Sequence, residues 1–264
     1  MNKLERQMSD MLKRGKDEFG WAAVKAEFEA EGTRLDELLR LVEIAHRADM
    51  AIAVKIGGCE ALMDLFEAKQ IGVDYIIAPM IETSYALSKF DIALKKAYSS
   101  DDREDTQFLW NIETTTGFQN RKEMAELAVQ SGELAGVVFG RSDYCGSIGL
   151  NSDNVNDDVV INDVIEVAKV CEAHNLDIVV GGGVSVDSIP GLKRIRDVKL
   201  TRFETRKVVM WSSALDNSKI EDGMLAALQF ELKWLTNKRD YYNAIYREDE
   251  KRFTTLKSRW NLQD

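Results

Sequence analysis

The sequence predicts an α/β protein built as a (β/α)8 TIM barrel, with an additional helix at the N-terminus and a helical extension at the C-terminus. Short apolar or β-branched runs alternate with segments of helical periodicity seven times between residues 24 and 236. Such alternation is typical of parallel strands whose right-handed crossovers place helices outside the sheet. The length of 264 residues suits one closed barrel, and the absence of a Gly-x-Gly-x-x-Gly turn or a Walker loop disfavours an open nucleotide-binding sheet.

Each expected element follows from its own pattern. Leu4, Met8 and Leu12 recur at helical spacing, which predicts an amphipathic helix over residues 4–18. The expected strands are residues 24–29, 51–58, 73–80, 107–114, 134–140, 177–185 and 200–210. The helices expected after them are residues 34–48, 59–70, 84–98, 121–131, 158–174, 187–196 and 219–236. We expect the eighth strand either at residues 19–23 or in an irregular stretch without periodicity.

The chain is expected to comprise a barrel over residues 1–215 and a helical extension over residues 216–264. Aromatic residues are frequent in this extension: Trp234, Tyr241, Tyr242, Tyr246, Phe253 and Trp260. A helix with such residues generally packs against a partner surface. We therefore expect the extension to be an interface in a homo-oligomer.

Composition excludes several classes of protein. The 35 Lys and Arg residues against 45 Asp and Glu residues give a net charge of −10, which disfavours nucleic acid as a partner. Cys59, Cys145 and Cys171 lie far apart without a Cys-x-x-Cys spacing, so neither a disulfide framework nor a structural zinc site is expected. No apolar run is long enough to span a membrane. We expect a cytoplasmic protein that acts on a small molecule.

Charged and polar side chains occur near the carboxyl ends of several expected strands, where barrel enzymes carry their chemistry. Glu113 and Asp143 are the most informative, because two carboxylates at neighbouring strand ends are ligands suited to Mg²⁺ or Mn²⁺. The alternative is that each pairs with an arginine or caps a helix. His46 and His174 fall late in expected helices and are interpreted as solvated helix-end residues.

Several segments resemble the HpcH/HpaI aldolase and citrate lyase β-subunit family. They are Asn-Ile-Glu-Thr at residues 111–114, Val-Phe-Gly-Arg-Ser-Asp at 138–143, Ser-Ile-Gly at 147–149 and the strand that ends in Pro-Met at 79–80. The resemblance covers roughly residues 24–215 and implies a metal-dependent pyruvate aldolase or related lyase on a (β/α)8 barrel. It makes Glu113 and Asp143 the metal ligands, Asn111 the polar residue beside the glutamate, and the turn of Gly140, Arg141, Ser142 and Asp143 a backbone cradle for the pyruvate carboxylate.

Two positions depart from the family pattern. The family's Asp-x-Glu-His segment, whose histidine is a general base, corresponds to Glu27-Phe28-Glu29-Ala30, so that histidine is missing. The family's oxyanion-stabilising arginine corresponds to Lys55, which carries the charge without the bidentate fork. A different base or a different reaction is implied.

The leading hypothesis is a divalent-metal lyase that makes or breaks a carbon–carbon bond between pyruvate and an aldehyde. Lys55 would face the enolate oxygen, and Glu27 or Glu29 would act as base with a pKa raised by burial and by the other carboxylate. The alternative is that Glu27 and Glu29 pair with Lys25, Lys55 or an arginine of the barrel and only position the substrate. The cations expected to hold a polyhydroxy or phosphorylated acceptor are Arg141, Arg202 and Arg206. For the charged strand at residues 200–210, internal ion pairs with Glu204 are the alternative.

The sequence leaves three other functions open. Lys55 would act as a Schiff-base nucleophile in a metal-independent aldolase. A barrel that lacks its base would instead serve as a ligand-binding or scaffold subunit. An acyl-CoA lyase is the weakest reading, because no basic segment is available for the coenzyme's phosphate.

Overall fold

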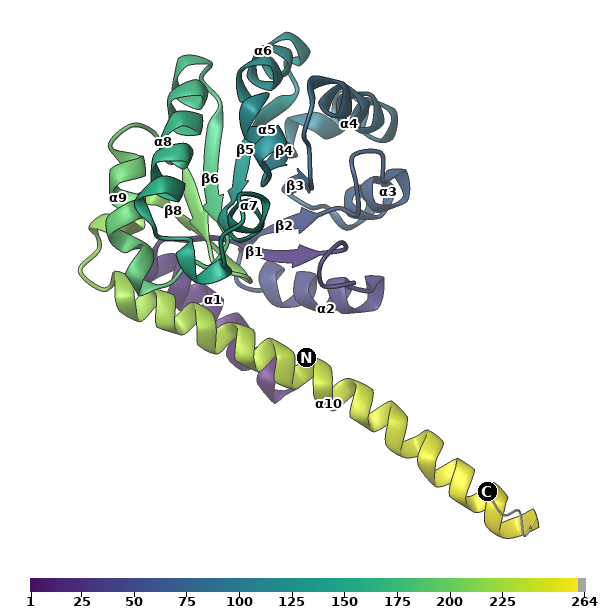
Figure 1. The fold of residues 1–264 in the computed structure, drawn as a ribbon. Coiled ribbons are helices and arrows are strands. Elements are labelled where there is room, and N and C mark those ends of the chain that lie inside the picture. The colour runs from purple at the N-terminus through teal and green to yellow at the C-terminus, as the bar shows by residue number, and fades with distance from the viewer. Residues whose placement is uncertain (261–264) are drawn as a thin grey trace.

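In the computed structural model, which describes residues 1–260, eight strands form one closed barrel in sequence order (Figure 1). This arrangement confirms the expected barrel. The strands are β1 (Trp21–Glu27), β2 (Ala51–Lys55), β3 (Tyr75–Ala78), β4 (Gln107–Ile112), β5 (Leu134–Gly140), β6 (Asp177–Gly181), β7 (Arg202–Glu204) and β8 (Val208–Trp211).

Helices surround the barrel (Figure 1). They are α1 (Lys3–Phe19), α2 (Leu35–His46), α3 (Leu62–Ile71), α4 (Ser84–Ala97), α5 (Thr115–Gln119), α6 (Arg121–Ser131), α7 (Arg141–Ser147), α8 (Asp158–Ala173), α9 (Ile189–Arg196) and α10 (Ile220–Trp260). Every expected helix is present with its ends shifted by a few residues, except that the helix expected at residues 219–236 continues to Trp260. The short helices α5 and α7 were not expected, because one turn or two of helix leaves no periodic pattern.

The closure of the barrel differs from the expectation of uniform βα units. Residues 200–210 were expected to form one strand, but they form a hairpin in which β8 runs antiparallel to both β7 and β1. Thr205 closes the turn, because its backbone N–H donates to the carbonyl oxygen of Val208 at 2.9 Å. Residues 19–23, the other candidate for the eighth strand, belong instead to α1 and to the start of β1.

The barrel interior is arranged in layers, because alternate residues of each strand point inward. The middle layer is apolar and consists of Ala23, Ala53, Ile77, Leu109, Val138, Val179 and Val209. On its amino-terminal side lie residues that begin strands, among them Tyr75, Gln107, Asp177 and Arg202. On its carboxyl-terminal side lie Lys25, Lys55, Asn111 and Glu204. The apolar layer therefore separates two polar layers.

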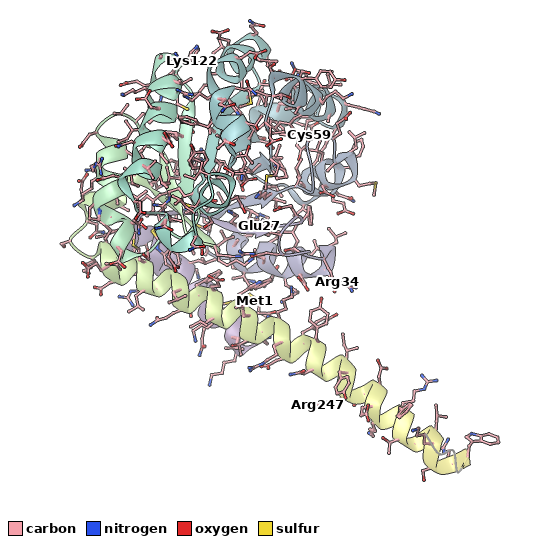
Figure 2. All side chains as sticks on the ribbon, in the orientation of Figure 1. Met1, Glu27, Arg34, Cys59, Lys122 and Arg247 are labelled. Atoms are coloured by element: carbon pink, nitrogen blue, oxygen red, sulfur yellow. The ribbon has the colours of Figure 1, made fainter. Side chains whose placement is uncertain are left out.

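The N-terminal helix and the first part of α10 pack against each other beside the barrel (Figure 1). Gly223 of α10 permits this close packing, since a Cβ there would lie 3.0 Å from the Cβ of Phe19 on α1. The rest of α10 projects beyond the barrel, and Arg247 lies on this projecting part (Figure 2). Residues 216–260 are thus mostly helical as expected, whereas residues 261–264 of the extension lie outside the described residues. No helix within residues 1–260 is long and apolar enough to cross a membrane.

Candidate active site

A cavity of about 300 Å³ opens at the carboxyl ends of the strands. Its volume is at the lower end of the range for small-molecule sites. The charged and polar side chains that line it come from β1, β2, β4, the start of α7, β7 and the adjoining loops: Lys25, Glu27, Glu29, Lys55, Asn111, Glu113, Ser142, Asp143, Glu204, Thr205 and Arg206. Gly140, another residue expected at the site, also lines the cavity, whereas the expected residues Arg141 and Arg202 do not.

Glu113 is the most buried carboxylate of the cavity, with 1% of the residue exposed. Its Oε1 accepts a hydrogen bond from the backbone N–H of Met80 at 2.9 Å, and its Oε2 accepts one from Asn111 Nδ2 at 2.6 Å. Lys55 Nζ lies 3.4 Å from the same Oε2. Met80 adopts a positive φ of 50°, which is unusual for a residue with a side chain and aims its N–H at the carboxylate. The loop after β3 therefore orients Glu113.

Two acceptor groups in the cavity have no partner within residues 1–260. The Asn111 Oδ1 atom is buried and accepts no hydrogen bond, while its amide nitrogen is held by Glu113. The Asp143 carboxylate, which is exposed at the start of α7, forms no hydrogen bond or ion pair with the described residues. Buried acceptors are normally satisfied, so an orphaned one in a cavity indicates a place for a ligand.

Lys25 lines the cavity, whereas the sequence suggested it only as an ion-pair partner of Glu27 or Glu29. Its ammonium lies 3.0 Å from Glu27 Oε1 and donates a hydrogen bond to Glu204, so that it links β1 to β7. Burial by itself would lower the pKa of Lys25, but the charges of Glu204 and Glu27 outweigh it and raise the pKa. The sequence does indicate that Lys25 points into the barrel, because it stands two residues before Glu27 on the same strand and therefore lies on the same face.

The two candidate bases differ in their surroundings. Glu27 ends β1, and its label in Figure 2 marks that strand end, whereas Glu29 lies in the loop that follows. Burial would raise the pKa of Glu27, but Lys25, Lys55 and Arg206 outweigh it and hold the pKa below its usual 4.5. The expectation of a raised pKa is therefore wrong for Glu27. Glu29 keeps 30% of its side chain exposed, and among the residues that the structure describes it forms one ion pair, with Lys55 Nζ at 3.3 Å.

Gly182 leaves two backbone N–H groups accessible at the start of α7. A Cβ on this residue would lie 2.5 Å from the nitrogen of Ser142 and 2.7 Å from that of Arg141. The φ of Gly182 is +76°, a conformation that side chains disfavour. The first N–H groups of a helix have no partner within the helix, so this concave backbone surface suits an anion such as a carboxylate.

The arginines expected to hold an acceptor lie in three different places. Arg141 is fully buried and donates to the carbonyl oxygens of Gly181 and Val155, so its guanidinium points away from the cavity. Burial lowers its pKa to about 10. Arg202 lies below the apolar layer, where it forms an ion pair with Asp177 at 2.8 Å. The expectation that these two side chains bind substrate is wrong, because packing directs them elsewhere. Arg206 alone reaches the cavity.

This fold and cavity define a class of protein, a barrel with a carboxylate-rich small-molecule site at the carboxyl ends of its strands. The sequence profile of one family, HpcH/HpaI aldolase/citrate lyase, matches residues 33–189, more than half of the chain. The chain belongs to the HpcH/HpaI aldolase/citrate lyase family, whose members are carbon–carbon lyases. No curated protein sequence matches the chain significantly.

Solved structures share the barrel at low sequence identity. An HpcH/HpaI aldolase from Desulfitobacterium hafniense DCB-2 is 12% identical, with a TM-score of 0.61 over 75% of this chain and 82% of that one. The citrate synthase SbnG is 18% identical, with a TM-score of 0.59 over 88% and 90% of the two chains. A family protein from Burkholderia cenocepacia J2315 is 11% identical, with a TM-score of 0.60 over 91% and 90%. At these low sequence identities, the structural similarity shows that the fold is shared and nothing further.

The Lys25 ion pairs generate a prediction about stability and its pH dependence. Lys25→Met leaves Glu27 and Glu204 buried without their cation, so we expect the free energy of unfolding at pH 7 to fall by about 3–5 kcal/mol. Wild-type Glu27 contributes stability above its usual pKa of 4.5 and loses it as the pH falls through the lower folded value. In the variant, protonation neutralises the two carboxylates that have lost their cation. The difference in the free energy of unfolding between wild type and variant is therefore expected to become smaller from pH 7 to pH 5.

Urea unfolding at the two pH values measures this effect. Lys219→Met is the matched control, because Lys219 forms an exposed ion pair with Glu18 at 3.5 Å. We expect this control to lose less than about 1 kcal/mol. Equal losses in the two variants, or a Lys25→Met deficit that grows on acidification, would contradict the prediction.

Proposed function

We propose that this protein is a divalent-metal-dependent lyase that forms or cleaves a carbon–carbon bond between pyruvate and an aldehyde, of the class II pyruvate aldolase type. The observation that carries the proposal is the convergence of Glu113, Asp143 and Lys55 on one small cavity in a chain of this lyase family. A sugar-derived aldehyde would give a 3-deoxy-2-oxo acid. The three cysteines are free, which agrees with a cytoplasmic location.

We propose Mg²⁺ or Mn²⁺ as the metal, because the oxygen ligands of the cavity fit these ions. The family is generally dependent on divalent metals. Glu113 and Asp143 offer hard oxygen ligands, and the orphaned Asn111 Oδ1 lies in the same cavity. No group of three or more His, Cys, Asp or Glu side chains within residues 1–260 is placed to hold a metal, so water and substrate would complete the coordination, as Mg²⁺ commonly requires. Bound there, the metal would polarise the keto oxygen of pyruvate.

The protein groups would each contribute to the reaction. The backbone N–H groups of Arg141 and Ser142 would bind the pyruvate carboxylate, in the space that the missing Cβ of Gly182 leaves open. Gly140 gives similar access to Glu113, since a Cβ there would lie 2.7 Å from Oε2. Lys55 would place positive charge beside the enolate oxygen that forms when the methyl proton leaves. Carbon 3 then attacks the aldehyde carbon, and the resulting alkoxide takes up a proton.

Glu29 is the base that the surroundings favour. Its carboxylate lines the cavity, is partly exposed and, within residues 1–260, forms an ion pair only with Lys55, the residue that would face the enolate. Glu27, by contrast, is held in its ionised form by Lys25, Lys55 and Arg206, which makes it a weak proton acceptor. We therefore assign proton removal to Glu29 and a structural role to Glu27.

The two rival functions have distinct signatures. A Schiff base on Lys55 would require Nζ to leave both Glu29 and Glu113, with which it is paired. Borohydride reduction with pyruvate would then trap an adduct on Lys55, and chelators would not inhibit. A scaffold subunit would not exchange the methyl protons of pyruvate with solvent at all.

The metal site predicts the behaviour of two variants. Glu113→Gln and Asp143→Asn each remove one negatively charged ligand, so we expect each to lower Mn²⁺ affinity by at least about tenfold and to abolish deuterium exchange into pyruvate. Calorimetric titration and NMR measure the two effects, and thermal unfolding checks that the fold is intact. Glu172→Gln, on the exposed face of α8, is the control. Unchanged metal affinity in either site variant would rule out this metal site.

The assignment of the base predicts an asymmetry between neighbouring carboxylates. Glu29→Gln is expected to slow deuterium exchange into pyruvate by about 100-fold or more, the usual contribution of a general base. Glu27→Gln makes the same chemical change in a residue whose charge its neighbours already compensate. We expect the exchange rate of this variant to fall by less than about tenfold. Wild-type exchange in Glu29→Gln would place the base elsewhere.

We further propose that α10 mediates a homo-oligomer. Leu225, Leu228, Leu232 and Leu235 form a stripe at helical spacing, and each is at least 50% exposed. The projecting part of the helix exposes Tyr246, Phe253 and Trp260 as well. A second copy of the chain is the partner that accounts for such a surface, because the same stripe occurs on each copy.

Charge on the stripe should therefore dissociate the oligomer. The double variant Leu228→Glu with Leu235→Glu is expected to elute as a monomer at micromolar concentration, whereas wild type elutes as a multimer. Gln229→Glu introduces the same charge at an exposed polar position and should leave the assembly intact. Size-exclusion chromatography with light scattering measures the mass, and a monomeric wild-type protein would refute the proposal.

A further inference from the structure

Arg141 differs from the other buried cations of the barrel because no carboxylate pairs with it. Lys25, Lys55, Arg202 and Lys207 are also buried, and each of them forms at least one ion pair. Arg141 is 0% exposed and has no ion pair within residues 1–260. A buried charge without an opposite charge is unfavourable, so the hydrogen bonds of this guanidinium have to compensate for its burial.

The guanidinium of Arg141 donates four hydrogen bonds, all to neutral acceptors. Nε donates to the carbonyl oxygen of Gly181 at 3.1 Å, and Nη2 donates to Ser188 Oγ at 3.3 Å. Nη1 donates to the carbonyl oxygen of Val155 at 3.2 Å and to Asn156 Oδ1 at 3.0 Å. One side of the guanidinium therefore holds the end of β6 and the turn before α9, and the other side holds the loop between α7 and α8.

The first of these sides holds both ends of the segment Gly181-Gly182-Gly183. Gly181 is bound directly, and Ser188 Oγ lies 3.5 Å from the carbonyl oxygen of Gly183. Between them lies Gly182, the residue whose missing Cβ leaves the two backbone N–H groups of the proposed carboxylate cradle accessible. One of these N–H groups belongs to Arg141 itself. The side chain of this residue thus fixes the wall that faces its own backbone N–H.

Three consecutive glycines need such support from outside the segment. Glycine has more conformational freedom than other residues, and it has no side chain that packing could hold in place. Gly182 and Gly183 both adopt positive φ values, of +76° and +64°. A guanidinium suits this task, because its donors point in several fixed directions within one plane, whereas a lysine offers a single ammonium on a flexible stem.

The charge of Arg141 indicates what the supported backbone binds. The described residues provide no carboxylate to pair with this guanidinium, and charges interact over longer distances where water is excluded. A carboxylate in the adjoining cradle would therefore compensate a charge that the protein leaves unbalanced.

We infer that Arg141 is a positioning residue for the carboxylate of pyruvate. Its guanidinium holds Gly181 directly and Gly183 through Ser188, and it thereby keeps Gly182 beside the N–H groups of the cradle. Arg141 itself does not touch the substrate with its side chain. The inference rests on the proposed function, which assigns the cradle to the pyruvate carboxylate.

Two acceptors of the guanidinium test the inference in the full-length protein with pyruvate and Mn²⁺. Replacing Arg141 itself would release three segments at once, whereas each acceptor can be removed singly. Ser188→Ala removes the hydroxyl that leads to Gly183 and adds no volume to this fully buried position. Asn156→Ala is the matched control, because it removes a hydrogen bond of the same guanidinium on the side away from the glycines.

Deuterium exchange into pyruvate, measured against pyruvate concentration, gives KM and kcat for the three proteins. We expect Ser188→Ala to raise KM by about fivefold or more and to change kcat by less than about twofold, because the cradle binds the carboxylate before and during proton removal. Asn156→Ala is expected to leave both constants within about twofold of wild type. Titration with Mn²⁺ alone should give one affinity for all three proteins, since neither residue is among those that line the cavity.

The possible outcomes separate this inference from the proposed function. If wild type exchanges no deuterium, the proposed function fails and the inference fails with it. If wild type exchanges and Ser188→Ala keeps the wild-type KM, or both variants raise KM equally, only the inference is overturned, because the guanidinium then acts as a general brace. A loss of kcat without a change in KM, or a lowered Mn²⁺ affinity in Ser188→Ala, would overturn it as well.

Discussion

The ion pair between Lys25 and Glu204 spans the point at which the barrel closes. β8 lies between the strands that carry these residues, and it runs antiparallel to both. The pair therefore connects β1 directly to β7, two strands that otherwise meet only through β8. Removing two charges from water is unfavourable unless they pair closely, so the first and seventh strands are held at the separation that the pair requires. The carboxyl-terminal mouth, and with it the cavity, depends on this closure.

The apolar middle layer of the barrel determines where chemistry can occur. Ala23, Leu109 and Val179 belong to this layer, which keeps the polar residues above it apart from those below. Arg202 and Glu204 illustrate the effect, since they are two residues apart on β7 and both point inward, yet they lie on opposite sides of the layer. One therefore joins a structural ion pair at the base, and the other lines the cavity.

The turn between β7 and β8 connects the cavity to the long helix. Arg206 faces the cavity, while Lys207 next to it forms an ion pair with Glu31 and lies 5.9 Å from the ring of Trp234 on α10. Glu231 on the same helix has a pKa raised by burial, although Lys207 and Arg206 act in the opposite direction. The helix that we propose for assembly thus packs against the turn that borders the site, and burial of α10 in an oligomer would stabilise that turn.

The sequence by itself determined the alternation of strands and helices, the barrel, and most of the polar residues of the cavity, because inward positions at strand ends follow from periodicity. It did not reveal the hairpin, since residues 205–207 contain no Gly, Pro or Asn to mark a turn within the strand expected at residues 200–210. Nor did it predict the directions of Arg141 and Arg202, or the lowered pKa of Glu27. Those properties were decided by the tertiary structure, because the partners that orient a long side chain or set a carboxylate's pKa come from strands distant in sequence.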